Sequence, residues 1–270
     1  MSRVPGQHKG ALPTVRAFQS AVVRWTSKSD LPPLPPEEID AKMRQSLLRE
    51  WKNDREVQDL EKLGYALGVG KIILADSDIV EDMNGQYYCA RRDPLKQFKF
   101  RVTGGYEKSL NLWKLSRKQR ATINRTFRSG RDVILVAYQA SGDFPATLAH
   151  ELGHYINHTL WGLSRVEAKL PGECFPVTQN MRRVARFDEA HLLKNRDEFY
   201  AETWSRFLCG GGSRTLLRYL QRPLGRLRTR HPEKARLIER HRIKAIREKR
   251  NWLNTRGVVN DEQPGIADCG

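Results

Sequence analysis

The sequence predicts an α+β domain followed by a basic helical extension. Its central part mixes short apolar runs of strand type with stretches whose apolar residues recur at helical spacing. The chain has 270 residues, of which 39% are hydrophobic, and this is enough for one sizeable core. We expect a basic arm with a proline-rich linker at residues 1–36, the main domain at 37–212, the helical extension at 213–257 and a disordered tail at 258–270.

The N-terminal arm is basic: residues 1–29 contain no acidic side chain. This bias is compatible with a transit peptide, but the segment lacks the apolar core and small-residue cleavage pattern of a secretory signal, so a disordered basic arm is favoured. The four cysteines are widely spaced without a Cys-x-x-Cys pair, which favours reduced thiols. We therefore expect a cytoplasmic, reducing location, the alternative being a delivered effector or an organelle-targeted protein. No apolar run is long enough to span a membrane.

The first helical stretch is expected over residues 37–67. Prolines precede it, Glu37 and Glu38 lie in its first turn, and two successive apolar runs follow at helical spacing before a group of glycines. Residues 71–75 form a short apolar run that predicts a buried strand.

Strand signals continue through the middle of the chain. Asn84-Gly85 is the strongest hairpin signal and predicts a strand on either side of it. Residues 97–103 alternate between apolar and polar and predict a half-exposed strand, whereas residues 115–127 predict a polar, basic helix. Residues 132–138 give the best strand signal. We expect this strand at the edge of the sheet, where it could pair with an extended peptide substrate.

A helix that carries chemistry is expected from residue 144 to about residue 161. Pro145 lies in its first turn. Its N-cap is expected to be Ser141 or Asp143. The stretch His150-Glu-Leu-Gly-His154 lies in the middle of this helix.

The pattern His-Glu-x-x-His joins two metal-ligating rings to an acid. His150 and His154 leave one face of a helix one turn apart, so both rings can reach one small cation. Glu151 lies about 100° round the helix, where its carboxylate can reach a water on the metal. The pattern predicts zinc on the histidines and Glu151 as general base. The alternative is a pair of solvent-facing histidines on an ordinary helix.

A catalytic zinc needs a third protein ligand. His158 lies one turn beyond His154, but a straight helix does not wrap three successive turns around one ion, so we expect His158 at the surface or near the ligands. The three-histidine metzincin pattern is excluded, because its later positions are Asn157 and Leu160. Three further acidic residues lie in a stretch in which we expect no helical order: Glu167, Glu173 and Glu189.

A better source of the third ligand is the helix expected at residues 197–207. Glu198 and Glu202 share one face of it, and the small Ala201 lies among bulky aromatic residues, which would let this helix approach another closely. Two carboxylates one turn apart suit a metal site, one as ligand and the other as acceptor of the second N–H of a ligand histidine. The alternative, a solvated acidic face, fits poorly with these aromatic residues and a net charge of +17.

His-Glu-Leu-Gly-His followed by Glu-Phe-Tyr-Ala-Glu resembles the gluzincin metallopeptidases, and more narrowly the family of the anthrax lethal factor catalytic domain, whose second signature is Glu-Phe-Phe-Ala-Glu. The likeness covers about residues 130–210. It implies a zincin-like fold, with a small twisted mixed sheet, an edge strand, a zinc helix and a glutamate-bearing helix. By this resemblance one Zn²⁺ is bound by His150, His154 and Glu198, Glu151 activates the water, and Glu202 orients a ligand histidine, with His150 as first candidate.

The resemblance also implies an oxyanion donor, for which the family uses a tyrosine at the position of His191. An N–H of His191 aimed at the developing negative charge would serve the same purpose. We therefore expect a zinc-dependent endopeptidase that hydrolyses peptide bonds of a protein or peptide substrate. The family's substrate-binding modules are not recognisable in this chain, so the resemblance implies nothing about the identity of the substrate.

The basic extension accounts for much of the net charge. Residues 214–250 hold fourteen basic and three acidic side chains, a local net charge of +11. Three interpretations stay open: a helical face packed on the domain, a surface for nucleic-acid phosphates, and a site for a membrane surface or an acidic partner. A second helix is expected here at about residues 232–252. The alternative function is therefore a basic nucleic-acid-binding protein, or a nucleoprotein-directed protease, on the same scaffold.

Overall fold

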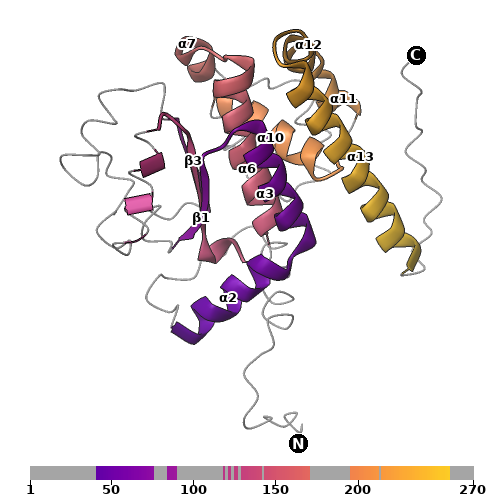
Figure 1. The fold of residues 1–270 in the computed structure, drawn as a ribbon. Helices are drawn as coiled ribbons and strands as arrows, with labels where there is room; N and C mark the ends of the chain where they lie inside the picture. The colour runs from indigo at the N-terminus through magenta and orange to yellow at the C-terminus, as the bar shows by residue number, and fades with distance from the viewer. Residues whose placement is uncertain are drawn as a thin grey trace, which may run out of the picture.

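The structure is a computed structural model. It describes the following residues, together with several helical positions between 118 and 126: 41–75, 84–89, 129–141, 143–170, 195–212 and 214–255. The expectations for the basic arm and linker, the strand at 97–103, His191 and the C-terminal tail lie outside the described residues. Figure 1 shows the helices gathered beside a small sheet, with the C-terminal helices farthest from it.

The first helical stretch divides in two. α2 (Ala41–Asn53) and α3 (Arg55–Leu67) meet at Asp54, whose carboxylate accepts hydrogen bonds from two backbone N–H groups in the first turn of α3, at 2.8 and 3.0 Å. Such an N-cap starts a new helix. Gly68, with φ 108°, ends α3 in the left-handed conformation that glycine tolerates. The helical stretch expected over 37–67 is confirmed for its described residues, with a break at Asp54.

The sheet has the order β1-β3-β2 and is mixed. β1 (Lys71–Ala75) runs parallel to β3 (Val133–Ala137), and β2 (Gly85–Tyr88) runs antiparallel to β3. The expectation that residues 132–138 form the edge strand is wrong, because β3 is the central strand. All five residues of β3 are buried, and a strand covered on both faces needs such an uninterrupted apolar run.

Two further expectations for this region are tested in part. Asn84 directly precedes β2, and its carbonyl oxygen accepts a hydrogen bond from the backbone N–H of Ala137 at 2.8 Å. The other strand of the expected hairpin lies outside the described residues. The positions described between 118 and 126 are helical, in agreement with the helix expected at 115–127.

α6 (Phe144–Tyr155) packs on β2 and β3 and carries the His-Glu-x-x-His motif. The helix was expected to continue unchanged to residue 161, but it becomes a π-helix, η5 (Ile156–Trp161), whose wider turn changes the direction of the side chains. Pro145 lies in the first turn of α6, as expected. Asp143 occupies the N-cap position without a capping hydrogen bond from its side chain, and Ser141 does not cap the helix either, so the expected cap is not formed.

Glu167 lies in a short helix, α7 (Arg165–Lys169), so the expectation that it has no helical order is wrong. Its carboxylate accepts the backbone N–H of Ser164 at 3.1 Å, and its own N–H donates to the hydroxyl of Ser164 at 3.1 Å. The carboxylate of Glu167 thus takes part in a reciprocal capping box at the start of α7.

α10 (Arg196–Leu208) packs along α6, and the contact is closest between Gly153 and Ala201. Phe199 and Trp204 anchor α10 in the core with 1% and 0% of their surface exposed. The expected helix at 197–207, with its aromatic anchors and its close approach at Ala201, is confirmed.

The C-terminal helices contribute side chains to the same hydrophobic core as the elements that precede them. α11 (Arg214–Arg218), α12 (Gln221–Arg230) and α13 (Pro232–Thr255) bury Leu220 and Ile238, among others, within it. The ammonium of Lys234 donates to the carbonyl oxygen of Leu67 at 2.5 Å, and Lys244 pairs with Asp59. The helix expected at about 232–252 is therefore present and packed on the domain. No helix in the described part of the chain is long and apolar enough to cross a membrane.

Candidate metal centre

α6 places both histidines of the motif on the side that faces α10. The Nε2 atoms of His150 and His154 lie 3.1 Å apart, and their rings meet edge to face with centroids 4.8 Å apart. Both side chains are largely buried, with 16% and 12% exposed. Two ring nitrogens that share one small volume are suited to one ion rather than to solvent.

Glu198 reaches these rings from the first turn of α10. Asn195 caps this helix by accepting the backbone N–H of Glu198 at 2.9 Å. One carboxylate oxygen of Glu198, Oε2, then lies 3.2 Å from Nε2 of His150 and 3.4 Å from Nε2 of His154. The structure therefore brings together the three residues that the sequence predicts as ligands, from two helices far apart in the chain.

The spacing of these three donor atoms matches a tetrahedral metal ion. The edges of the triangle formed by the two Nε2 atoms and Oε2 of Glu198 measure 3.1, 3.2 and 3.4 Å. A tetrahedral zinc with bonds of about 2.0–2.1 Å holds its ligand atoms about 3.3 Å apart. One oxygen and two nitrogens at this spacing fit zinc without any movement of the helices.

Glu202 lies one turn beyond Glu198 and contacts the other nitrogen of His150. Its Oε2 is 3.4 Å from Nδ1 of His150, and its Oε1 accepts a hydrogen bond from Nε of Arg206 at 2.9 Å. Only 4% of Glu202 is exposed. A buried carboxylate at this nitrogen favours an Nδ1–H, which places the lone pair of the His150 ring on Nε2, the atom that would bind a metal. This is the position that the sequence predicts for Glu202.

Asp197 and His158 complete the surroundings of His154, and sequence reasoning did not find this pair. Oδ1 of Asp197 lies 3.2 Å from Nδ1 of His154, and its Oδ2 lies 2.6 Å from Nε2 of His158. His158, with 13% of its side chain exposed, is not a surface residue; it lies beside the ligands. The signal that could have identified Asp197 is its place directly before Glu198, at the start of the same helix.

The carboxylates of this centre favour protonation of the rings. Burial alone would lower the pKa of His150, but hydrogen bonds with Glu198 and Glu202 raise it to about 9. Burial also opposes the charging of His154, yet Asp197 and Glu198 raise its pKa well above the usual value. A divalent cation would carry the same charge as these two ring protons, and would replace them on binding.

Glu151 lies between the candidate ligands, whose charges act on its carboxyl, and the start of β2. It is 5% exposed, and burial raises the pKa of its carboxyl. A Cβ added to Gly85 would come within 2.9 Å of both Cγ and Oε1 of Glu151, and equally close to Thr147. A side chain at position 85 would therefore force β2, Glu151 or Thr147 to shift.

The chain matches no protein-family model, and neither a curated protein nor a solved structure matches it. The resemblance to the gluzincins therefore depends on the two sequence motifs alone.

Proposed function

We propose that this protein is a zinc-dependent endopeptidase in which His150, His154 and Glu198 hold the metal. The observation that carries the proposal is the triangle of donor atoms, whose edges of 3.1–3.4 Å match the ligand spacing of a tetrahedral ion. The carboxylates behind the rings, Asp197 and Glu202, add support, because ligand histidines ordinarily donate their second N–H to such a group.

Glu151 is the general base of the proposed reaction. A zinc ion at the site would supply Lewis acidity, which lowers the pKa of a water toward about 7 and polarises a substrate carbonyl. Glu151 takes a proton from the water while the water oxygen attacks the carbonyl carbon of the peptide bond. Glu151 then returns this proton to the nitrogen of the leaving amine as the C–N bond breaks. A carboxyl whose pKa is raised by burial suits this double use. His191 stays a prediction as the oxyanion donor.

The place of the substrate follows from β2 rather than β3. Within the described residues β2 pairs with β3 alone, and it begins at Gly85, directly against Glu151. An extended peptide that pairs with the other side of β2 through its backbone would pass beside the base. In this proposal β2, rather than the strand expected at residues 132–138, is the edge strand that pairs with the substrate.

Metal analysis combined with a peptide-library digest tests the proposed function. The purified full-length chain should contain one zinc and cleave peptides. His150→Ala and Glu198→Ala should lose both metal and activity, whereas Glu151→Gln should keep the zinc and lose activity by at least about a hundredfold. Glu233→Gln is the matched control, because that carboxylate is 75% exposed on α13. Normal turnover in Glu151→Gln would refute the mechanism.

A second candidate function has one observation in its favour. Three of the four arginines of α12 recur every four residues: Arg222 and Arg230 are exposed and Arg226 is half-buried, while Leu227 packs into the core. A row of arginines at this spacing suits the phosphates of a nucleic acid. Binding of nucleic acid through α12 would be compatible with proteolysis at α6.

A further inference from the structure

We propose that Asp197 and His158 act together as positioning residues that hold His154 in the tautomer and ring orientation a metal requires. This inference rests on the proposed metal site and adds a second layer to it. Asp197 lies between the two rings, with one oxygen 3.2 Å from Nδ1 of His154 and the other 2.6 Å from Nε2 of His158.

The tautomer of His154 follows from its two neighbours. A neutral imidazole carries a proton on one nitrogen and a lone pair on the other. A carboxylate accepts only, so Asp197 selects the form with a proton on Nδ1. Nε2 of His154 then presents its lone pair to the triangle formed with His150 and Glu198. Without Asp197, the two tautomers would compete and metal binding would have to select one of them.

Asp197 is itself fixed from η5. Nδ2 of Asn157 donates to Oδ1 of Asp197 at 3.0 Å and to its backbone carbonyl oxygen at 3.2 Å. Asn157 is completely buried, and its own Oδ1 accepts the indole N–H of Trp204 at 3.1 Å. These bonds connect η5 with α10, so the carboxylate of Asp197 has little freedom to leave the rings.

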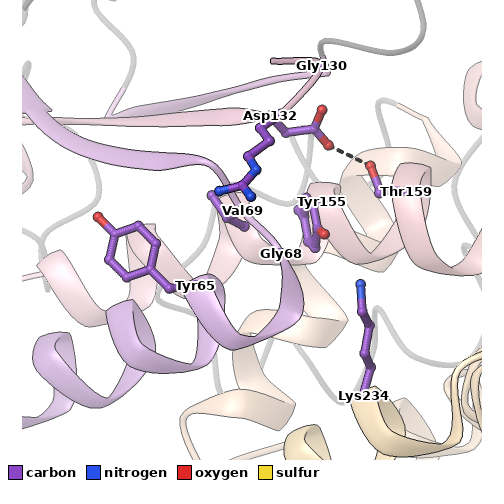
Figure 2. A pocket seen from close by; sticks show the side chains of 9 residues that line it. Tyr65, Gly68, Val69, Gly130, Asp132, Tyr155, Thr159 and Lys234 are labelled. Carbon is purple, nitrogen blue, oxygen red and sulfur yellow. Dashed lines mark hydrogen bonds between the residues drawn. The ribbon is translucent and has the colours of Figure 1, made fainter. Parts of the chain in front are cut away.

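His158 is held by stacking on both sides. Its ring lies nearly parallel to that of His154, with centroids 6.3 Å apart, and nearly parallel to that of Tyr87, with centroids 5.9 Å apart. The hydroxyl of Tyr87 donates to Asp132 at 2.8 Å, which fixes the far end of the stack. Figure 2 shows Asp132 on the wall of a hollow, where it also accepts the hydroxyl of Thr159 at 2.7 Å.

The same atoms offer a rival arrangement. Ligand atoms of His154, His158 and Asp197 also lie close enough together to hold a metal ion. Both sets use His154, and a neutral ring has one lone pair, so it cannot serve two ions at once. The first set has an oxygen and two nitrogens at tetrahedral spacing, while Asp197 and His158 are 2.6 Å apart, which is hydrogen-bonding distance. We therefore interpret His154, His158 and Asp197 as a hydrogen-bonded group and not as a second metal site.

The test is the zinc affinity of the full-length protein, measured by competition with a chelator. Asp197→Ala should weaken zinc binding about 10–100-fold while one zinc per chain is still bound at saturation. Asp197→Asn keeps the shape of the side chain and should also weaken zinc binding, because an amide has one accepting oxygen and cannot accept hydrogen bonds from both rings as a carboxylate does. His158→Phe keeps the stack but removes the N–H, and should weaken binding less. His231→Ala, a histidine at the start of α13, is the control and should change nothing.

The double variant separates positioning from a general structural effect. If His158 acts through Asp197, His158→Phe should cost no further affinity in the Asp197→Ala background. NMR of the zinc-loaded protein should show a protected Nδ1 proton on His154 that is lost in Asp197→Ala and kept in His231→Ala. Additive losses, or unchanged affinity in Asp197→Ala while His150→Ala abolishes binding, would overturn the positioning role and leave the proposed function standing. Two zinc ions per chain, or none, would also overturn it, and none would remove the proposed function as well.

Discussion

Gly153 of α6 and Ala201 of α10 lie so close that a Cβ added to Gly153 would come within 2.6 Å of the carbonyl oxygen of Ala201. The two helices that carry the candidate ligands therefore meet through a glycine. Gly153 lies within the motif, one residue before His154, so this contact sets how near Glu198 comes to the rings.

Gly153→Ala should destabilise the protein by about 1–3 kcal/mol, because the new methyl group must push α10 away. Zinc affinity should fall with it, since Glu198 moves with α10. Urea denaturation and chelator competition measure the two effects. The control is Gly225→Ala in α12, where nothing lies within 4 Å of the added Cβ; it should leave zinc affinity unchanged and stabilise by up to about 1 kcal/mol. Equal stability in both variants would contradict the tight contact.

Gly85→Ala should separate metal binding from catalysis. The added methyl group would overlap with Glu151 and Thr147, so either β2 or the carboxylate of Glu151 must shift. We expect one bound zinc, as in the wild type, with kcat/KM lowered about tenfold or more. Metal analysis and a fluorogenic peptide assay give the two readouts. Full activity in this variant would show that the position of β2 does not matter to the base.

In the metal-free protein, the pH dependence of the free energy of unfolding should show the titration of His150. Its pKa in the folded state, about 9, lies above the ordinary value of 6.5, so the protonated ring stabilises the fold. This contribution, about 3 kcal/mol at most, is fully present below pH 6.5 and is lost as the pH rises through 9. Urea denaturation with a chelator present should show wild type and His150→Ala converging over this range. A constant difference would argue against the raised pKa.

Zinc affinity should rise over the same range, because the ring protons must leave.

Nucleic-acid binding is tested best by substitution on α12. Changing Arg222, Arg226 and Arg230 together to Gln should lower the slope of log K against log salt by about 2–3 if these side chains contact phosphates. Removing everything after Gly212 is unsuitable, because it would strip buried leucines such as Leu220 from the core. Lys244, which pairs with Asp59, supplies the control variant Lys244→Gln. An unchanged slope in the triple variant would exclude α12 as the contact surface.

Spacing along one helix was the most informative signal in the sequence. It predicted that His150 and His154 share a face, and the pair Glu198 and Glu202 followed from the same rule applied to α10. The anchoring residues Phe199 and Trp204 fixed which side of α10 is buried, and this made the meeting of the two helices predictable.

Relationships across elements were harder to predict. The central place of β3 was missed, although its uninterrupted apolar run is typical of a strand covered on both faces. The pair of Asp197 and His158 depends on the change from α6 to the π-helix η5, and local spacing does not reveal where a helix widens. The break at Asp54 depends on a cap inside a stretch of otherwise continuous helical character.

The packing of α13 against α3 and α10 bears on the order of events during synthesis. A nascent chain has all three candidate donors once residue 198 has been made, yet α10 lacks its contacts with α13 until much later. An unfinished polypeptide would hold Glu198 on an incompletely supported helix. We therefore expect the candidate donor triangle to be held firmly only after α13 has been synthesised.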